Sequence, residues 1–115
     1  MRSVLAGITF LFAANLCAAT TAHAACFEDL GQTGCTNRET FPRSDLRRLS
    51  CQSLWLVRNT IYDENGFCFK TSAAQAQFDN SDCTVKNAAN VKLNSHERAN
   101  ISRIRQVERE KGCKP

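Results

Sequence analysis

Residues 49–69 read Leu-Ser-Cys-Gln-Ser-Leu-Trp-Leu-Val-Arg-Asn-Thr-Ile-Tyr-Asp-Glu-Asn-Gly-Phe-Cys-Phe, and this stretch decides the fold. A helix is predicted to begin after Ser50, because a serine side chain caps a helix start well. It is expected to run to about Asn65, because Gly66 takes the left-handed closing conformation without strain. An extended return over residues 67–69 should follow. At the helical period of about 100° per residue, one face carries Cys51, Leu54, Trp55, Arg58, Ile61, Tyr62 and Asn65.

Two more helices are predicted after this stretch. A short one is expected over residues 72–78, where three alanines favour it, and residues 79–90 should form a loop. The last helix should begin after Asn94, with Glu97 as its capping-box partner. Its apolar stripe consists of Ile101, Ile104 and Val107. The sequence therefore predicts a small all-α domain with two long antiparallel helices and one short helix.

This pattern resembles the YARHG domain, a small extracellular-type bacterial domain whose name spells a tyrosine-to-glycine stretch. Tyr62 and Gly66 match that stretch, whereas residues 63–65, Asp-Glu-Asn, stand where the name has Ala, Arg and His. The resemblance covers roughly residues 46–113. It continues through Arg58, Asn59, Phe78, Leu93, Ser95, Glu97, Arg98, Asn100, Ile101, Ile104 and Glu108. It implies a domain type and an exported location, and the family brings no agreed molecular activity.

Residues 1–24 are predicted to be an export signal. Arg2 supplies a short basic start, and an apolar run follows over residues 4–19. Residues 22–24, Ala-His-Ala, then offer the small-x-small pattern that a signal peptidase cleaves. The apolar run is shorter than the ~20 residues of a transmembrane helix, which disfavours an anchor. We therefore expect export without a membrane anchor, either to the periplasm or to the medium.

The competing possibility is a lipoprotein with its lipid on Cys26. His23 occupies the position where a lipidation signal normally carries an aliphatic residue, so we expect cleavage after Ala24. Mass spectrometry of the exported protein should find an unmodified Ala25 at its N-terminus. A diacylglycerol adduct on Cys26 would contradict this prediction and leave an odd number of cysteines to pair.

The remaining cysteines predict a disulfide framework. The chain has seven cysteines in 115 residues, and loss of the signal with Cys17 leaves an even number in a short exported chain. A zinc site is disfavoured because there is no Cys-x-x-Cys pair and His96 is the only histidine after the signal. Residues 25–45 are expected to be irregular, with the packed domain beginning at Leu46.

Helix length selects the pairing. Cys51 opens the first helix and Cys68 follows its end, so about 21 Å of helix separates them, whereas bonded cysteines have α-carbons within about 7 Å. In an antiparallel pair the start of the first helix meets the end of the last, which pairs Cys51 with Cys113. Cys68 then pairs with Cys83 around the short helix, and Cys26 with Cys35 closes the N-terminal loop.

Arg58 is the most informative polar residue because it lies on the apolar face of its helix. An unpaired charge there would cost several kcal/mol. Antiparallel helices would bring Glu108 within about a turn of it. We therefore expect a structural ion pair, with an anionic ligand on Arg58 as the alternative.

Four more residues form a possible binding surface: Trp55, Asn59, Tyr62 and Asn100. The two asparagines are expected to hydrogen-bond loop backbone. The two aromatic residues are expected to pack in the core, with a shallow groove as the alternative. Asp63 and Glu64 oppose the dipole at the end of their helix, so a positive neighbour is expected nearby.

Catalysis is not expected. No Ser-His-Asp or Cys-His set is available, and Glu97 and Glu108 would lie about 16 Å apart on one helix, too far to flank one bond. With 15 Lys and Arg in the chain, one of them in the signal, and 11 Asp and Glu, the mature charge is too small to indicate nucleic acid.

We expect an exported interaction module of the bacterial envelope that binds a protein or a cell-wall component, without a cofactor or metal. One alternative is an inhibitor that inserts the loop of residues 27–34 into a secreted hydrolase. The other is a carboxylate-dependent hydrolase of envelope polymers. A rigid exposed loop would favour the inhibitor, and a pocket lined by two or more carboxylates would favour the enzyme.

Overall fold

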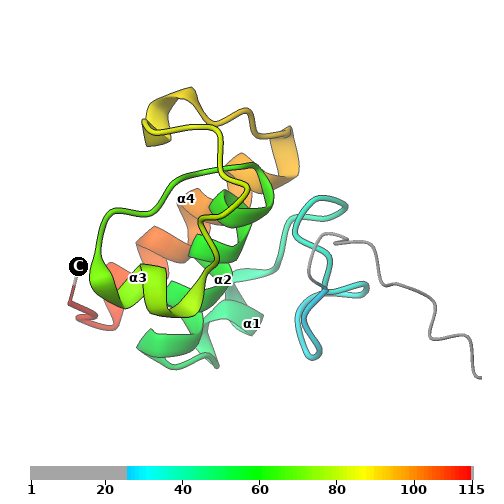
Figure 1. The fold of residues 1–115 in the computed structure, drawn as a ribbon. Coiled ribbons are helices and arrows are strands. Elements are labelled where there is room, and N and C mark those ends of the chain that lie inside the picture. Colours follow the sequence, from blue (N-terminus) through cyan, green and yellow to red (C-terminus); the bar gives the residue numbers. More distant parts are fainter. Residues whose placement is uncertain (1–25, 115) are drawn as a thin grey trace, which may run out of the picture.

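The computed structural model describes residues 26–114, so the expected export signal lies outside the described residues. Figure 1 shows the labelled helices gathered together, with the segment before the last helix looping away from them. The elements are α1 (Arg43–Arg47), α2 (Cys51–Glu64), α3 (Ser72–Gln77), the 3-10 helix η1 (Ala88–Asn90) and α4 (Ser95–Glu110). Residues 26–114 contain isolated β-bridges, Cys26 with Cys35 and Phe67 with Val85, but no strand. The all-α prediction is confirmed.

The ends of the long helices are set by local side-chain chemistry. The Ser50 side chain accepts a hydrogen bond from the Ser53 backbone at the start of α2. Gly66 has a φ of 84° just beyond the other end, a backbone conformation that glycine adopts most easily. At the start of α4, Asn94 and Glu97 each bond the other's backbone N–H at 2.9 Å, which is the expected capping box.

The expectation for residues 25–45 and 79–90 needs correction. α1 lies partly inside the segment predicted to be irregular, and η1 lies in the segment predicted to be a plain loop. Both are short, and their sequences carry too few residues for a clear helical period. The packed part of the chain also begins before Leu46, because Leu30 and Phe41 are buried in the same cluster.

The helix α2 separates two apolar clusters. The larger cluster joins α1, α2, α4 and the N-terminal segment through Leu30, Phe41, Leu46, Leu54, Val57, Ile104 and Val107. The smaller cluster consists of Phe69, Ala74 and Phe78, with Trp55, Leu56, Tyr62 and Phe67 packed against it. The apolar residues of α2 therefore do not lie on the single face that the sequence predicted. Val57 is buried, and Trp55 and Tyr62 turn towards the second cluster.

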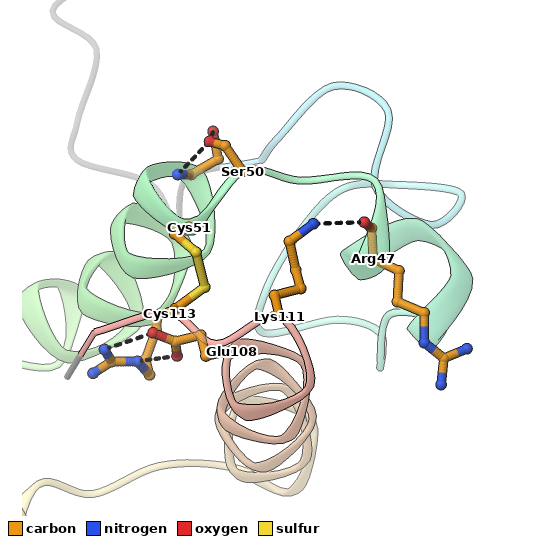
Figure 2. Close-up of a disulfide and its surroundings, with 8 residues drawn as sticks. Arg47, Ser50, Cys51, Glu108, Lys111 and Cys113 are labelled. Carbon is orange, nitrogen blue, oxygen red and sulfur yellow. Dashed lines mark hydrogen bonds and ion pairs between the residues drawn. A yellow bond between two sulfur atoms is a disulfide. The ribbon is translucent and has the colours of Figure 1, made fainter.

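Disulfides tie the elements together. They join Cys26 to Cys35, Cys51 to Cys113 and Cys68 to Cys83, which are the pairs that helix length selected. Figure 2 shows the Cys51–Cys113 bond between the start of α2 and the chain just after α4. Beside it, the Lys111 ammonium donates to the Arg47 carbonyl at 3.1 Å. At the other end of α2, the Asn65 amide donates to Glu97 at 2.6 Å.

Candidate functional site

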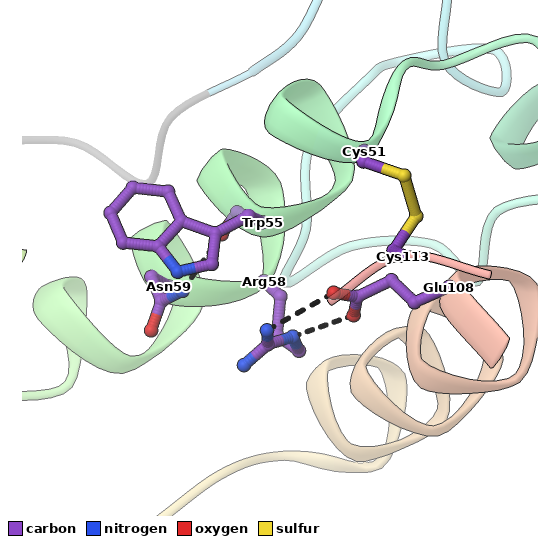
Figure 3. Close-up of polar contacts among 6 residues, drawn as sticks. All are labelled: Cys51, Trp55, Arg58, Asn59, Glu108 and Cys113. Carbon is purple, nitrogen blue, oxygen red and sulfur yellow. Dashed lines mark hydrogen bonds and ion pairs between the residues drawn. A yellow bond between two sulfur atoms is a disulfide. The ribbon is translucent and has the colours of Figure 1, made fainter. Parts of the chain in front are cut away.

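Arg58 and Glu108 meet in the structure. The Arg58 Nε donates to one Glu108 oxygen at 2.7 Å and its Nη2 donates to the other at 3.1 Å. Figure 3 shows this two-point contact and a second terminal nitrogen of Arg58 turned away from Glu108. The side chains are 16% and 11% exposed, so water screens the pair only weakly. The structural partner expected for Arg58 is therefore present, and one edge of its guanidinium remains directed elsewhere.

The four residues proposed as a possible binding surface do not all lie at the surface, because Asn100 is buried. Trp55 is half-buried, with its ring centroid 5.9 Å from that of Phe78. Tyr62 is half-buried against Phe67, with centroids 5.8 Å apart. Both are therefore packed aromatics. Asn59 donates to the Trp55 carbonyl of its own helix at 2.9 Å, rather than to a loop.

The prediction that Asn100 belongs to a binding surface is wrong, because its side chain is fully buried. Its oxygen accepts from the Phe41 N–H at 2.8 Å, and its amide nitrogen donates to the carbonyls of Thr36 and Glu39 at 3.0 and 2.9 Å. The expectation that it bonds loop backbone is met, but its place is inside the protein. Asn100 fastens the N-terminal segment to α4.

The loop of residues 27–34 is held by two carboxylates. Asp45 accepts from the Gly31 N–H, and Glu39 accepts from the N–H groups of Gln32 and Thr33 and from the Thr33 hydroxyl. The Thr33 hydroxyl is the main cause of a lowered Glu39 pKa. Although most of the loop is exposed, Leu30 is buried in the larger cluster. Only part of the loop is therefore available to enter another protein.

A cleft lined by acidic residues lies where α2 ends and α4 begins. We call it the acidic cleft, and its volume is about 430 Å³. It is lined by Asn37, Asp63, Glu64, Asn65, Asp79, Asp82, Asn94 and Glu97. The sequence pattern did not indicate it, because Asp79 and Asp82 belong to a segment without periodicity. The only signal was the pairing of Cys68 with Cys83, which returns that segment to the end of α2.

Backbone hydrogen bonds build the wall of the acidic cleft. The N–H groups of Thr84 and Val85 both donate to the Gly66 carbonyl at 2.9 Å, and the Cys68 N–H donates to the Val85 carbonyl at 2.8 Å. The Cys68–Cys83 disulfide closes the same segment covalently. Asp79 and Asp82 are consequently held near Asp63 by the fold rather than by attraction between the side chains.

The electrostatics of the acidic cleft reverse the expectation of a positive neighbour. Burial, followed by the negative charges of Asp82 and Asp79, raises the pKa of Asp63 above its ordinary value. The Ser81 N–H and hydroxyl both donate to Asp79 at 2.8 Å and lower the pKa of that carboxyl. The charges that act on Asp63 are therefore negative, because the folded loop brings two more acids to the end of α2.

One residue that lines the acidic cleft, Asn37, carries a buried acceptor without a partner. The Asn37 Oδ1 is buried and has no hydrogen-bond donor in the described part of the chain. Glu97, in contrast, is occupied by Asn94 and Asn65. Among residues 26–114, no group of three or more His, Cys, Asp or Glu residues is placed to hold a metal ion.

Comparison with protein families matches residues 32–109 to the YARHG domain. The chain belongs to the YARHG domain family. The match begins before residue 46 and so includes part of the segment that Asn100 fastens to α4. Searches of curated proteins and of solved structures find no significant match.

The YARHG domain is a small extracellular-type domain whose activity is not known, and the three disulfides fit an exported protein. Within residues 26–114, no helix is long and apolar enough to cross a membrane. Tyr62 and Gly66 of the namesake stretch are retained. Asp63, Glu64 and Asn65 replace the rest of that stretch, and all three line the acidic cleft.

Proposed function

We propose that this YARHG protein is an exported interaction module of the bacterial envelope. In this proposal the acidic cleft receives a positively charged group of a protein or cell-wall component, and no catalysis follows. The observation that carries the proposal is the cleft itself, which gathers the carboxylates of Asp63, Asp79 and Asp82 at the end of α2. Like charges held together by the fold repel one another, and a bound cation would relieve that repulsion.

Hydrogen bonding supports the same ligand class. An ammonium or guanidinium group carries several N–H donors, and the carboxylates of Asp63 and Asp82, which line the cleft, are hydrogen-bond acceptors. Contacts at both ends of the long helices support a rigid frame. Cys51 joins Cys113 at one end and Asn65 bonds Glu97 at the other, as an antiparallel pair of α2 and α4 requires.

The experiment compares capture by three oxidised mature proteins. The wild type, Asp63→Asn/Asp82→Asn and Glu28→Gln/Asp29→Asn are immobilised and exposed to envelope extract, and each is sedimented with purified peptidoglycan. The last variant is the matched control, since it removes two negative charges from the N-terminal loop. We expect the wild type and the control to capture the same component, and the cleft variant to lose it severalfold, with a strong dependence on salt.

Equal capture by all three proteins would contradict a role for the acidic cleft. Selective loss in Glu28→Gln/Asp29→Asn would instead favour the inhibitor, because those residues lie in the loop that would enter a foreign active site. The captured component would then be a secreted hydrolase, and the mature protein should reduce its activity.

One observation favours a second candidate, a carboxylate-dependent hydrolase of envelope polymers. The acidic cleft is lined by more than two carboxylates, the feature that was expected to favour the enzyme. In that cleft the pKa of Asp63 is raised while that of Asp79 is lowered, and an acid and a base in glycoside hydrolysis differ in this way. Incubation of the mature protein with peptidoglycan tests this candidate. Release of soluble sugar that is abolished by Asp79→Asn would establish an enzyme and contradict the binding module.

A further inference from the structure

A second charged cavity lies near the other end of the two long helices. We call it the cationic cavity, and its volume is about 450 Å³, within the roughly 300–1,000 Å³ of small-molecule sites. It is lined by Arg58, Arg105, Glu108, Arg109, Cys113 and Lys114. It shares no lining residue with the acidic cleft. The charged residues that line it are mainly positive, whereas those of the acidic cleft are negative.

Among the described residues that line the cationic cavity, Glu108 is the only one with a carboxylate, and its charge is already neutralised. Both oxygens of Glu108 accept from Arg58. Arg105, Arg109 and Lys114 are exposed, and none of their side chains makes a hydrogen bond or ion pair within residues 26–114. Three uncompensated cations therefore face one cavity, together with the free terminal nitrogen of Arg58.

The cavity is preorganised on one side. Arg58 is fixed by two hydrogen bonds to Glu108, and Figure 3 shows its remaining nitrogen directed away from that carboxylate. The nearby Cys51–Cys113 disulfide holds the residue that precedes Lys114. A ligand that bonds the Arg58 nitrogen therefore meets a side chain whose conformation is already ordered, which lowers the entropy lost on binding.

We propose that the cationic cavity binds a phosphate group. The guanidinium fork matches phosphate oxygens, and several cations around one anion suit the multiple charge of phosphate better than the single charge of a carboxylate. In an envelope, such a group is carried either by a lipid headgroup or by a soluble or polymeric phosphate. The proposal does not depend on the acidic cleft, because the two sites use different residues.

Titration calorimetry with inorganic pyrophosphate and flotation with vesicles of phosphatidylglycerol or phosphatidylcholine test the proposal. The variant Arg105→Gln/Arg109→Gln removes two cations from the cavity and leaves the Arg58–Glu108 pair intact. The control Arg38→Gln/Arg98→Gln removes the same charge from exposed sites elsewhere, one of them on the same helix. Circular dichroism and unfolding midpoints verify that all the proteins are folded.

We expect the wild type and the control to bind pyrophosphate or phosphatidylglycerol with similar affinity, and the cavity variant to bind roughly tenfold more weakly. If the cavity variant binds pyrophosphate more weakly than the wild type and the control do, the ligand is a soluble or polymeric phosphate. If only its binding to phosphatidylglycerol vesicles is weakened, the ligand is a lipid headgroup. Equal weakening of both variants would show a general charge effect and overturn the proposal. Failure of the wild type to bind either probe at about 0.15 M salt would also overturn it.

Discussion

Arg58 and Asn100 are polar residues on the inner sides of the long helices, but they satisfy different needs. Arg58 pairs with a single charged side chain on α4. Asn100 is fully buried and pairs with three backbone groups of the N-terminal segment. A buried polar group that loses its partner costs more than the hydrogen bond contributes. Both residues should therefore be sensitive to substitution, for different reasons.

The ion pair is tested with a double-mutant cycle of Arg58→Met and Glu108→Gln. Removing one partner of a buried pair costs about 3–5 kcal/mol, and the 16% and 11% exposure of these side chains places the cost near 3 kcal/mol. Because each single variant already breaks the pair, the double variant should cost less than the sum. Urea unfolding of the oxidised proteins measures this. Small and additive effects would show that the pair contributes little.

Asn100→Ala should be strongly destabilising, and Asn59→Ala is its matched control. The first change leaves one N–H and two carbonyls without their partner, at a cost of at least about 3 kcal/mol. The second removes a bond to a carbonyl of its own helix and should cost less than about 1 kcal/mol, since alanine favours helix. Hydrogen exchange of the Phe41 N–H should accelerate only in Asn100→Ala. Equal unfolding midpoints would contradict this assignment.

At the scale of elements, α2 packs against a different part of the protein on each of its two sides and at its C-terminal end. Leu54 and Val57 pack towards α1 and α4, whereas Trp55 and Tyr62 pack towards the cluster around α3. Beyond its end, Gly66 accepts two hydrogen bonds from residues 84 and 85. This return brings acids to a helix C-terminus, where the macrodipole already disfavours negative charge. The acidic cleft is thus built at a cost in stability.

That cost predicts a pH dependence for Asp63. Its pKa is raised in the folded protein above the ordinary value of 3.8, so the folded state holds the proton more tightly than the unfolded state. The folded state therefore gains its full stabilisation from this proton at pH values below 3.8, and the stabilisation is lost as the pH rises through the folded-state pKa of Asp63. Asp63→Asn should therefore be more stable than the wild type at neutral pH, and this gain should shrink towards acid pH.

Thermal unfolding of both proteins across the acidic range measures this difference. Glu28→Gln serves as the control, because it removes one exposed negative charge outside the acidic cleft. Added salt should reduce the gain, since part of it comes from repulsion by Asp79 and Asp82. A gain that is independent of both pH and salt would mean that the substitution acts through packing instead.

At the scale of the whole molecule, three disulfides secure three different regions. Cys26–Cys35 closes the N-terminal loop, Cys68–Cys83 closes the wall of the acidic cleft, and Cys51–Cys113 joins the start of α2 to the chain after α4. A domain of this size buries a limited apolar area, so covalent links contribute a large share of its stability. The longest loop should contribute the most.

Paired Cys→Ala substitutions test that order. The sequence separations are 62, 15 and 9 residues for Cys51–Cys113, Cys68–Cys83 and Cys26–Cys35. Loop entropy then gives costs of about 4, about 3 and between about 2 and 3 kcal/mol, respectively. Chemical unfolding of each variant measures these costs, after peptide mapping without reduction has verified the remaining bonds. A larger cost for Cys26–Cys35 than for Cys51–Cys113 would contradict the loop-entropy explanation.

The sequence alone determined features that depend on local chemistry or on helix length. Ser50, Asn94 and Gly66 mark helix ends because their side chains, or the lack of one, satisfy or release nearby backbone. The rise of an α-helix separates Cys51 from Cys68, and an antiparallel arrangement of the two long helices then pairs Cys51 with Cys113. A charge on an apolar helix face needs a partner, and antiparallel packing of the two long helices is enough to assign Glu108 to Arg58.

Only the tertiary structure decided features that depend on contacts between segments without a sequence period. The polar N-terminal segment enters the core because Asn100 satisfies its backbone, and its pattern contains no sign of that contact. Asp79 and Asp82 oppose Asp63 because a disulfide and three hydrogen bonds fold their loop back onto α2. Likewise, Arg105 and Arg109 belong to one cavity with Arg58 only once the helices have packed. Charge balance along a sequence does not reveal which charges will become neighbours in space.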